Sequence, residues 1–235
     1  MPVTLAVEVD AATRTSALHY AADQERSRHA LLVLAHGAGA GHQHPFMTTV
    51  AHGLALAGIH VVTFNFPYTE QKRRAPDRAP VLERCFRRVV ERVRTLDELS
   101  ACRLFIGGKS MGGRIATHLA AQGLEDLRGL VALGYPLHPP GKPDQRRAAH
   151  LPSIAVPVLI VQGERDAFGT PAELQPVLET MKAPVTLHVV SDGDHSLAVR
   201  GRPRDDVYRQ VFDAIGEWID AQAEARALRT VGDRA

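Results

Sequence analysis

The chain has 235 residues, of which 45% are apolar and 23% charged, values typical of globular proteins, and its length suits a single domain spanning residues 1–235. The net charge of +2 gives no basis for nucleic-acid binding, and the two cysteines form no disulfide framework. No apolar stretch is long enough to cross a bilayer and the N-terminus has no signal-peptide pattern, so we expect a cytoplasmic protein without membrane or nucleic-acid partners.

The first third of the chain alternates apolar runs with one helical segment. Continuous apolar runs indicate strands covered on both faces, and a proline fits the first turn of a helix. Strands are expected at Val3–Val9, Ala17–Tyr20, Ala30–Ala35 and Ile59–Phe66, with a helix at Phe46–Ala57 that follows Pro45 and ends at Gly58.

The rest of the chain continues this alternation. The strongest helical periodicity follows Pro80, where apolar residues recur every three or four positions up to Leu96. Further strands are expected at Arg103–Gly107, Leu127–Leu133, Val156–Val161 and Val185–Val190, and further helices at Ser110–Gln122, Pro171–Met181 and Asp205–Ala225. The last ten residues are expected to fray.

The order of these elements predicts an α/β fold, with a mostly parallel central sheet and helices on both faces. Two segments lack periodicity and are expected to be loops: Pro67–Ala79 and Tyr135–Ser153. The second follows the strand Leu127–Leu133 and predicts a short segment that covers the sheet edge.

The sequence Gly108-Lys109-Ser110-Met111-Gly112 stands between an expected strand and an expected helix. Gly-x-Ser-x-Gly at such a junction is typical of a nucleophile elbow, a sharp turn that exposes a serine hydroxyl. The glycines are needed because larger side chains would collide with the neighbouring strand and helix. We therefore predict Ser110 as a nucleophile.

Gly108-Lys109-Ser110 also matches the end of a P-loop, which binds nucleotide phosphates. That motif requires a glycine five residues before Gly108, where this chain has Arg103, and a loop where Arg103–Ile106 predicts a strand. Both departures weigh against the nucleotide-binding hypothesis, and ATP binding lost in Lys109→Ala would support it.

A serine nucleophile needs a histidine base and a carboxylate that orients it, and in this architecture they follow in the order serine, acid, histidine. Asp166 and His195 come just after expected strands, at the edge where the sites of open α/β sheets assemble. We predict Ser110, Asp166 and His195 as the catalytic residues. The competing carboxylates are Glu164, Asp192 and Asp194.

The loop after the strand Ala30–Ala35 is rich in glycine, which lets backbone N–H groups approach a substrate oxygen. We predict an oxyanion hole formed by the N–H groups of Met111 and Ala38, with Gly37 as the alternative to Ala38. His36 is predicted to be structural.

Three nearby histidines, His42, His44 and His52, were considered as metal ligands. The pair His42-x-His44 could bind zinc, but no third ligand stands at a recognisable spacing from it, so we expect no metal site and no cofactor.

Several of these motifs resemble those of the dienelactone-hydrolase-like α/β hydrolases, and more narrowly the small group with testis-expressed hydrolase-like proteins and a eukaryotic chromatin-complex subunit. The similarity runs from Leu31 to Trp218, and its most specific motif is Gly107-Gly108-Lys109-Ser110-Met111-Gly112-Gly113-Arg114. The resemblance implies an α/β-hydrolase fold with Ser110, Asp166 and His195 as catalytic positions. Dienelactone hydrolases proper use a cysteine nucleophile, so their substrate is not carried over to Ser110.

Together these observations predict a serine hydrolase that cleaves a small ester or thioester through an acyl-enzyme. The alternative is a non-enzymatic interaction protein of the same fold, in which Asp166 and His195 lie too far from Ser110 to interact. Four basic residues either favour an anionic acyl group or are solvated surface: Lys109, Arg73, Arg74 and Arg114. The sequence does not specify an oligomeric state.

Overall fold

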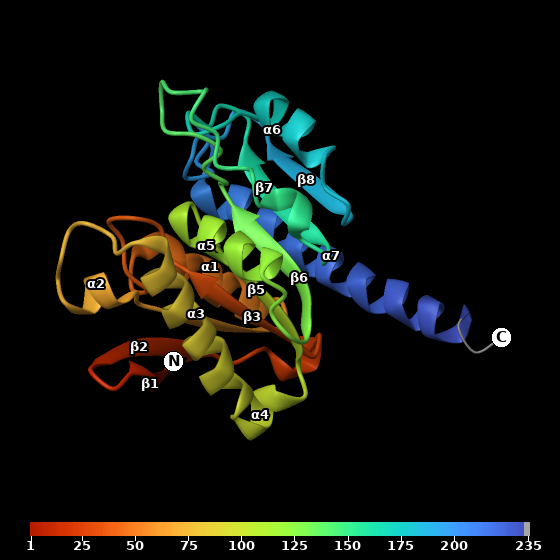
Figure 1. Cartoon of the computed structure of the whole chain (residues 1–235). Helices are drawn as coiled ribbons and strands as arrows, with labels where there is room; N and C mark the ends of the chain where they lie inside the picture. Colours follow the sequence, from red (N-terminus) through yellow and green to blue (C-terminus); the bar gives the residue numbers. More distant parts are fainter. Residues whose placement is uncertain (233–235) are drawn as a thin grey trace.

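The centre of the molecule is a twisted sheet of eight strands (Figure 1) in the order β1-β2-β4-β3-β5-β6-β7-β8. The computed structural model of the chain describes residues 1–232, with side chains described through residue 223. The six strands β3 to β8 pair in parallel. Strands β1 and β2 form an antiparallel ribbon that pairs with the free edge of β4. The predicted α/β class with a mostly parallel sheet is confirmed.

The strand bounds follow the apolar runs of the sequence. The strands are β1 Val3–Asp10, β2 Thr13–Tyr20, β3 Ala30–Ala35, β4 Ile59–Phe64, β5 Arg103–Lys109, β6 Leu127–Leu133, β7 Val158–Gly163 and β8 Val185–Val190. The inner strands β3 and β4 are buried along their whole length, because helices cover both faces of the sheet.

Helices form a layer on each face of the sheet, α3 and α5 on one side and α1 and α7 on the other (Figure 1). The α-helices are α1 Pro45–Leu56, α2 Pro67–Glu70, α3 Ala79–Arg94, α4 Asp97–Ser100, α5 Met111–Ala121, α6 Pro171–Leu178 and α7 Arg204–Gly232. Two 3-10 turns, at Gln24–Arg26 and Leu151–Ser153, lie in connecting segments.

The pleat of β3 divides the core between these layers. Leu31 and Val33 pack in the cluster that contains α3 and α5, and Leu32 and Leu34 pack in the cluster that contains α1 and α7. Successive side chains of a strand point to opposite faces, so an uninterrupted apolar run supplies both clusters. This sandwich fixes the carboxyl ends of the parallel strands, where the loops that carry the predicted site residues begin.

Several predicted strand boundaries were wrong by two to four residues. The strand predicted as Ala17–Tyr20 begins at Thr13, since its polar first half pairs with β1 in an exposed ribbon. The strand predicted as Val156–Val161 is β7, which starts after Pro157, a residue that has no N–H to donate to a sheet. The strand predicted as Arg103–Gly107 continues to Lys109, because Gly108 and Lys109 still pair with β6.

Other boundaries also differ. The strand predicted as Ile59–Phe66 ends at Phe64, and the expected loop Pro67–Ala79 opens with the short helix α2. The helix predicted as Pro171–Met181 ends at Leu178. The final helix was predicted as Asp205–Ala225, with a frayed tail, whereas α7 continues to Gly232; residues 233–235 lie outside the described residues.

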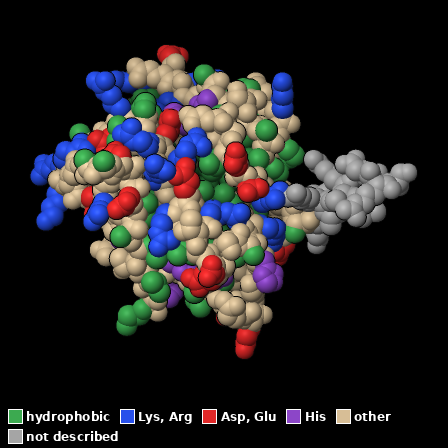
Figure 2. Space-filling view, turned by 60° about the horizontal axis from the view of Figure 1, so that its bottom comes forward, with side chains coloured by type: hydrophobic (Ala, Val, Ile, Leu, Met, Phe, Trp, Pro, Cys, Tyr) green, Lys and Arg blue, Asp and Glu red, His purple; other side chains and the backbone are tan. Residues whose placement is uncertain are grey.

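Within residues 1–232, no helix combines the length and the apolar character required to cross a bilayer. Figure 2 shows basic and acidic side chains interspersed over one face of the molecule, with small hydrophobic areas between them. Such a mixed surface agrees with the low net charge of +2.

Candidate active site

Ser110 lies in the sharp turn between β5 and α5. Its φ of 51° is in the left-handed region, which is rare and strained for a residue with a side chain, and its N–H donates to the Leu133 carbonyl at 3.0 Å. A Cβ at Gly112 would lie 2.3 Å from the Ala35 carbonyl oxygen, so only glycine allows α5 to approach β3 this closely. The structure therefore contains the predicted elbow geometry.

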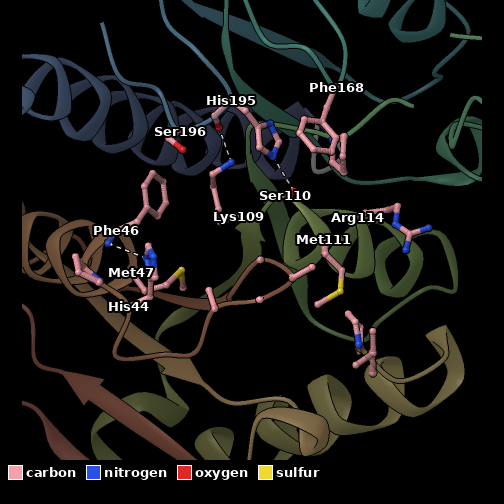
Figure 3. Close-up of a pocket in the computed structure, with 18 of the residues that line it drawn as sticks. His44, Phe46, Met47, Lys109, Ser110, Met111, Arg114, Phe168, His195 and Ser196 are labelled. Atoms are coloured by element: carbon pink, nitrogen blue, oxygen red, sulfur yellow. Dashed lines mark hydrogen bonds between the residues drawn. The ribbon is translucent and has the colours of Figure 1, made fainter. Parts of the chain in front are cut away.

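A hydrogen-bonded chain joins the three predicted catalytic side chains, and Figure 3 shows its first link, from Ser110 to His195. Ser110 Oγ lies 2.8 Å from His195 Nε2, and His195 Nδ1 lies 2.7 Å from Asp166 Oδ2. With the proton on Nδ1, the imidazole donates to the carboxylate and accepts from the serine hydroxyl. The residues come from the loops after β5, β7 and β8, so the fold assembles groups that are 85 and 29 positions apart in the chain.

Asp166 is fully buried, and its carboxylate has three donors. Besides His195, the Gln162 side-chain amide donates to Oδ2 at 2.8 Å and the Phe168 N–H donates to Oδ1 at 2.8 Å. These bonds replace the water that burial removes and fix the orientation of the carboxylate.

The competing carboxylates, Glu164, Asp192 and Asp194, form hydrogen bonds and an ion pair within the loops after β7 and β8. Glu164 accepts the N–H of Asp192, Asp192 pairs with Arg165 on the surface, and Asp194 Oδ1 accepts the N–H groups of Ser196 and Ala198. Asp194 therefore shapes the turn that presents His195 without contacting the imidazole. Among the carboxylates that the sequence left open, the geometry favours Asp166.

Two further contacts hold His195, one to its ring and one to its backbone carbonyl. The Phe168 ring stacks on the imidazole with centroids 4.1 Å apart and planes inclined by 28°, and Lys109 Nζ donates to the His195 carbonyl at 2.5 Å. The side chain of His195 keeps 21% of its surface exposed, so a substrate can still reach it.

Lys109 has a role that differs from two of the sequence hypotheses, the solvated surface cation and the P-loop lysine. It is the last residue of β5 and is only 9% exposed, so it is neither a solvated cation nor part of a phosphate-binding loop. Burial lowers the pKa of Lys109 to about 8, against the opposing effect of Asp166 and Asp194. The geometry contradicts the P-loop hypothesis, since residues 103–109 form a strand and the amine is engaged by His195.

The glycine-rich loop after β3 faces Ser110. Gly37, Ala38 and Met111 line the same pocket as the serine, and the N–H of Met111 is the first of α5, with no acceptor inside the helix. The N-terminus of α5 also favours negative charge. The assignment of the Ala38 and Met111 N–H groups as oxyanion donors remains a prediction.

His36 lies buried beneath this loop. Its Nδ1 donates to the Gly37 carbonyl at 2.8 Å, and its Nε2 accepts the Phe66 N–H at 3.1 Å. The bond accepted by Nε2 requires a neutral ring, and burial lowers the pKa of His36 to about 4. The side chain supports the loop from below and does not line the pocket.

We expect the protein to lose stability on acidification because of His36. Between pH 6.5 and about 4 the unfolded chain binds a proton at this ring that the folded chain does not, so stability falls as the pH decreases. The free energy of unfolding in urea should fall by about 2 kcal/mol more between pH 7 and pH 5 in the wild type than in His36→Asn. The exposed His29, changed to Asn, is the control; an equal fall in wild type and His36→Asn contradicts the assignment.

The three histidines considered as metal ligands, His42, His44 and His52, each have a separate structural contact. His44 Nδ1 accepts the Phe46 N–H at the start of α1, His42 Nε2 lies 3.2 Å from Ser16 Oγ, and His52 packs edge-on against Tyr20. In the part of the chain that the structure describes, no three His, Cys, Asp or Glu side chains are grouped as metal ligands.

The pocket above Ser110 has a volume of about 790 Å³. Its floor is formed by Ser110, Met111 and the loop after β3, and the segment between β6 and β7 contributes Pro136 and Arg147 to its wall. That segment is the short cover predicted from the sequence.

Two residues of the site were missed by sequence reasoning. Gln162 is fully buried and joins Asp166 to the Gly169 and Tyr135 carbonyls, while Phe168 stacks on His195. A glutamine at the end of an otherwise apolar strand, four residues before the candidate acid, was an available signal for the first. Phe168 had no such signal, because nothing local links it to His195.

The sheet topology, the elbow and the order of the three side chains together define the α/β-hydrolase architecture. The chain matches the model of the family described as alpha/beta hydrolase domain over residues 28–220, and it belongs to that family. The fold implied by the resemblance is thereby confirmed.

Solved structures of the same fold cover almost the whole chain. A dienelactone hydrolase from Anabaena variabilis is 18% identical, with a TM-score of 0.73 over 93% of this chain and 96% of its own. A serine hydrolase without a lid from Xanthomonas campestris is 19% identical, with a TM-score of 0.69 over 95% and 94%. Est1E from Butyrivibrio proteoclasticus is 14% identical, with a TM-score of 0.75 over 94% and 99%.

Proposed function

We propose that the protein is a serine hydrolase that cleaves a small ester or thioester through an acyl-enzyme. The observation that carries this proposal is the chain of two hydrogen bonds, 2.8 Å and 2.7 Å long, from Ser110 through His195 to Asp166 at the floor of a pocket. Membership of the alpha/beta hydrolase family supports the hydrolase class.

In the first half of the reaction, Ser110 Oγ attacks the substrate carbonyl while His195 Nε2 takes its proton. Asp166 stabilises the imidazolium that forms. The N–H groups of Ala38 and Met111 donate to the tetrahedral oxyanion. The intermediate collapses, the carbonyl–leaving-group bond breaks, and His195 returns the proton to the departing oxygen or sulfur.

In the second half, a water molecule replaces the alcohol or thiol. His195 takes a proton from the water as it attacks the acyl group on Ser110, and the carboxylic acid leaves with the serine hydroxyl restored. Every proton is carried by His195, and no cofactor enters the scheme. The alternative of a non-enzymatic module predicts that these side chains lie apart, which the distances in the structure do not favour.

A screen of p-nitrophenyl esters and acyl thioesters, combined with a fluorophosphonate probe, tests this proposal. We expect covalent labelling at one site per chain and hydrolysis of short-chain esters, with a nitrophenol burst when deacylation is slower than acylation. Peptide mapping should place the adduct on Ser110 and not on Ser196, the other serine of the pocket. Neither labelling nor hydrolysis of any ester would contradict the proposal and favour an interaction protein.

A further inference from the structure

Three arginines line the pocket, Arg114, Arg147 and Arg204, and the first two come from α5 and from the segment between β6 and β7. Arg114 lies on α5 one turn beyond Ser110, and its N–H donates to the Ser110 carbonyl at 3.0 Å. Residues four apart on a helix share a face, so the side chain of Arg114 lies on the side of α5 that carries the nucleophile. In Figure 3 it lies on the opposite side of Ser110 from His44 and Phe46.

The backbone of Arg147 is fixed by the segment that covers the sheet edge. Its N–H donates to the Leu137 carbonyl at 2.7 Å, and its carbonyl accepts the hydroxyl of the fully buried Tyr135 at 2.6 Å. Two hydrogen bonds to buried residues, Leu137 and Tyr135, therefore hold the backbone of Arg147 beside the pocket.

Neither guanidinium has an acidic partner among the side chains that the structure describes. The Nε atom of Arg114 is also buried without any hydrogen-bond partner. By contrast, Asp77, the carboxylate that lines the pocket, is paired with Arg73 at 2.6 Å. Asp77 is thus already paired and does not neutralise Arg114 or Arg147.

The environment of Arg114 is unfavourable for a lone cation. Burial and the nearby positive charge of Arg147 both lower the pKa of Arg114, against the opposing effect of Tyr135 and Glu83. Two like charges close together, with a buried donor unsatisfied, cost stability unless a ligand compensates them. Such an arrangement is expected where the missing partner arrives with the substrate.

We propose that Arg114 and Arg147 form a subsite for a carboxylate of the substrate, so that the natural substrate is an ester or thioester that carries a free carboxylate. A guanidinium presents parallel N–H donors that match the two oxygens of a carboxylate. The subsite presupposes the ester cleavage proposed above for Ser110. One helical turn, about 6 Å along the axis, separates the backbone of Ser110 from that of Arg114.

The opposite end of the pocket suits the uncharged part of such a substrate. Phe46, Met47 and Tyr208 contribute apolar surface there, and His44 is occupied as the cap of α1. Arg204 and Lys109 also line the pocket near these residues, with Lys109 Nζ 5.7 Å from the centre of the Phe46 ring. The apolar surface can therefore hold the uncharged part of the substrate, and the test below decides whether its carboxylate lies at Arg114 and Arg147.

A pair of matched esters tests the subsite. Mono-p-nitrophenyl glutarate carries a terminal carboxylate, and p-nitrophenyl pentanoate has the same chain length without it. After subtraction of the spontaneous rate, we expect kcat/KM of the wild type to be about tenfold to hundredfold higher for the glutarate. In Arg114→Met and Arg147→Met the ratio of the two values should fall toward one, and Arg114→Lys should keep part of it because it retains the charge without the fork.

A second pair tells whether the carboxylate belongs to the acyl group or to the alcohol. In 4-acetoxybenzoate the charge lies on the leaving group, and 4-acetoxybenzamide is its neutral match. A preference in the glutarate pair places the charge on the acyl side, and a preference in the benzoate pair alone places it on the leaving group; both depend on the two arginines.

The control is Arg88→Met, which removes an exposed arginine of α3 outside the pocket and should leave both ratios unchanged. Ratios near one in the wild type for both pairs, or ratios that survive in both arginine variants, overturn the carboxylate subsite while leaving ester hydrolysis intact. If no ester is cleaved and Ser110 takes no probe, the proposed function itself fails, and the two failures are distinguishable.

Discussion

Ser110→Ala is expected to lower kcat for the best p-nitrophenyl ester by about 10⁴-fold to 10⁶-fold. The variant removes the only protein atom that forms a covalent bond to the substrate in the proposed reaction, while the backbone turn that carries it is unchanged. Alanine adopts the left-handed φ of 51° with strain similar to that of serine, so the elbow should still form. Steady-state kinetics and fluorophosphonate labelling measure the loss, and circular dichroism reports the fold.

Ser153→Ala provides the control, since this serine lies in the turn before β7 and outside the pocket. It should label and turn over like the wild type. Labelling of Ser110→Ala at the wild-type rate would mean that another residue is the nucleophile, and the proposed reaction would then be wrong.

Asp166→Asn is expected to lower kcat by about 10⁴-fold. The amide retains the shape of the carboxylate, but it can donate a hydrogen bond to His195 Nδ1. The proton of the imidazole then moves to Nε2, the atom that faces Ser110 Oγ at 2.8 Å, and the ring can no longer accept the serine proton. The acceptor role of Asp166 toward Gln162 and Phe168 is also weakened, since one oxygen is replaced.

Asp192→Asn makes the same chemical change at a carboxylate that the sequence also offered. Asp192 lies on the surface and pairs with Arg165, so its loss should alter kcat by no more than about threefold. Comparable losses in Asp166→Asn and Asp192→Asn would contradict the special role of Asp166. Thermal unfolding of both variants separates loss of activity from loss of fold.

The architecture could be predicted from the sequence because local pattern encodes it directly. The run Ala30–Ala35 supplies both faces of a buried strand, and the three- and four-residue spacing after Pro80 supplies one face of a helix. Boundaries were less certain where local pattern and pairing compete. Thr13–Ser16 is polar and reads as loop, yet it forms strand because β1 pairs with it across a tight turn.

The core of the candidate site was predictable for a similar reason. Asp166 and His195 follow strands, and topology alone places the ends of parallel strands at one edge of the sheet. The supporting residues were not predictable in this way. Lys109, Gln162 and Arg147 act through contacts across 86, 27 and 12 positions, and the sequence around each gives no sign of its partner.

The contact between Lys109 and His195 has a consequence for engineering. The amine extends across the end of β6, where a Cβ at Gly134 would lie 2.8 Å from both Lys109 Nζ and the His195 carbonyl oxygen, and Gly134 itself has a φ of +64°. Lys109, Gly134 and His195 are thus packed against one another. Varying position 109 alone in a mutant library removes the bond from Lys109 to the His195 loop. Transferring only residues 108–112 to another scaffold loses the same bond. Positions 109, 134 and 195 therefore have to be varied or transferred together.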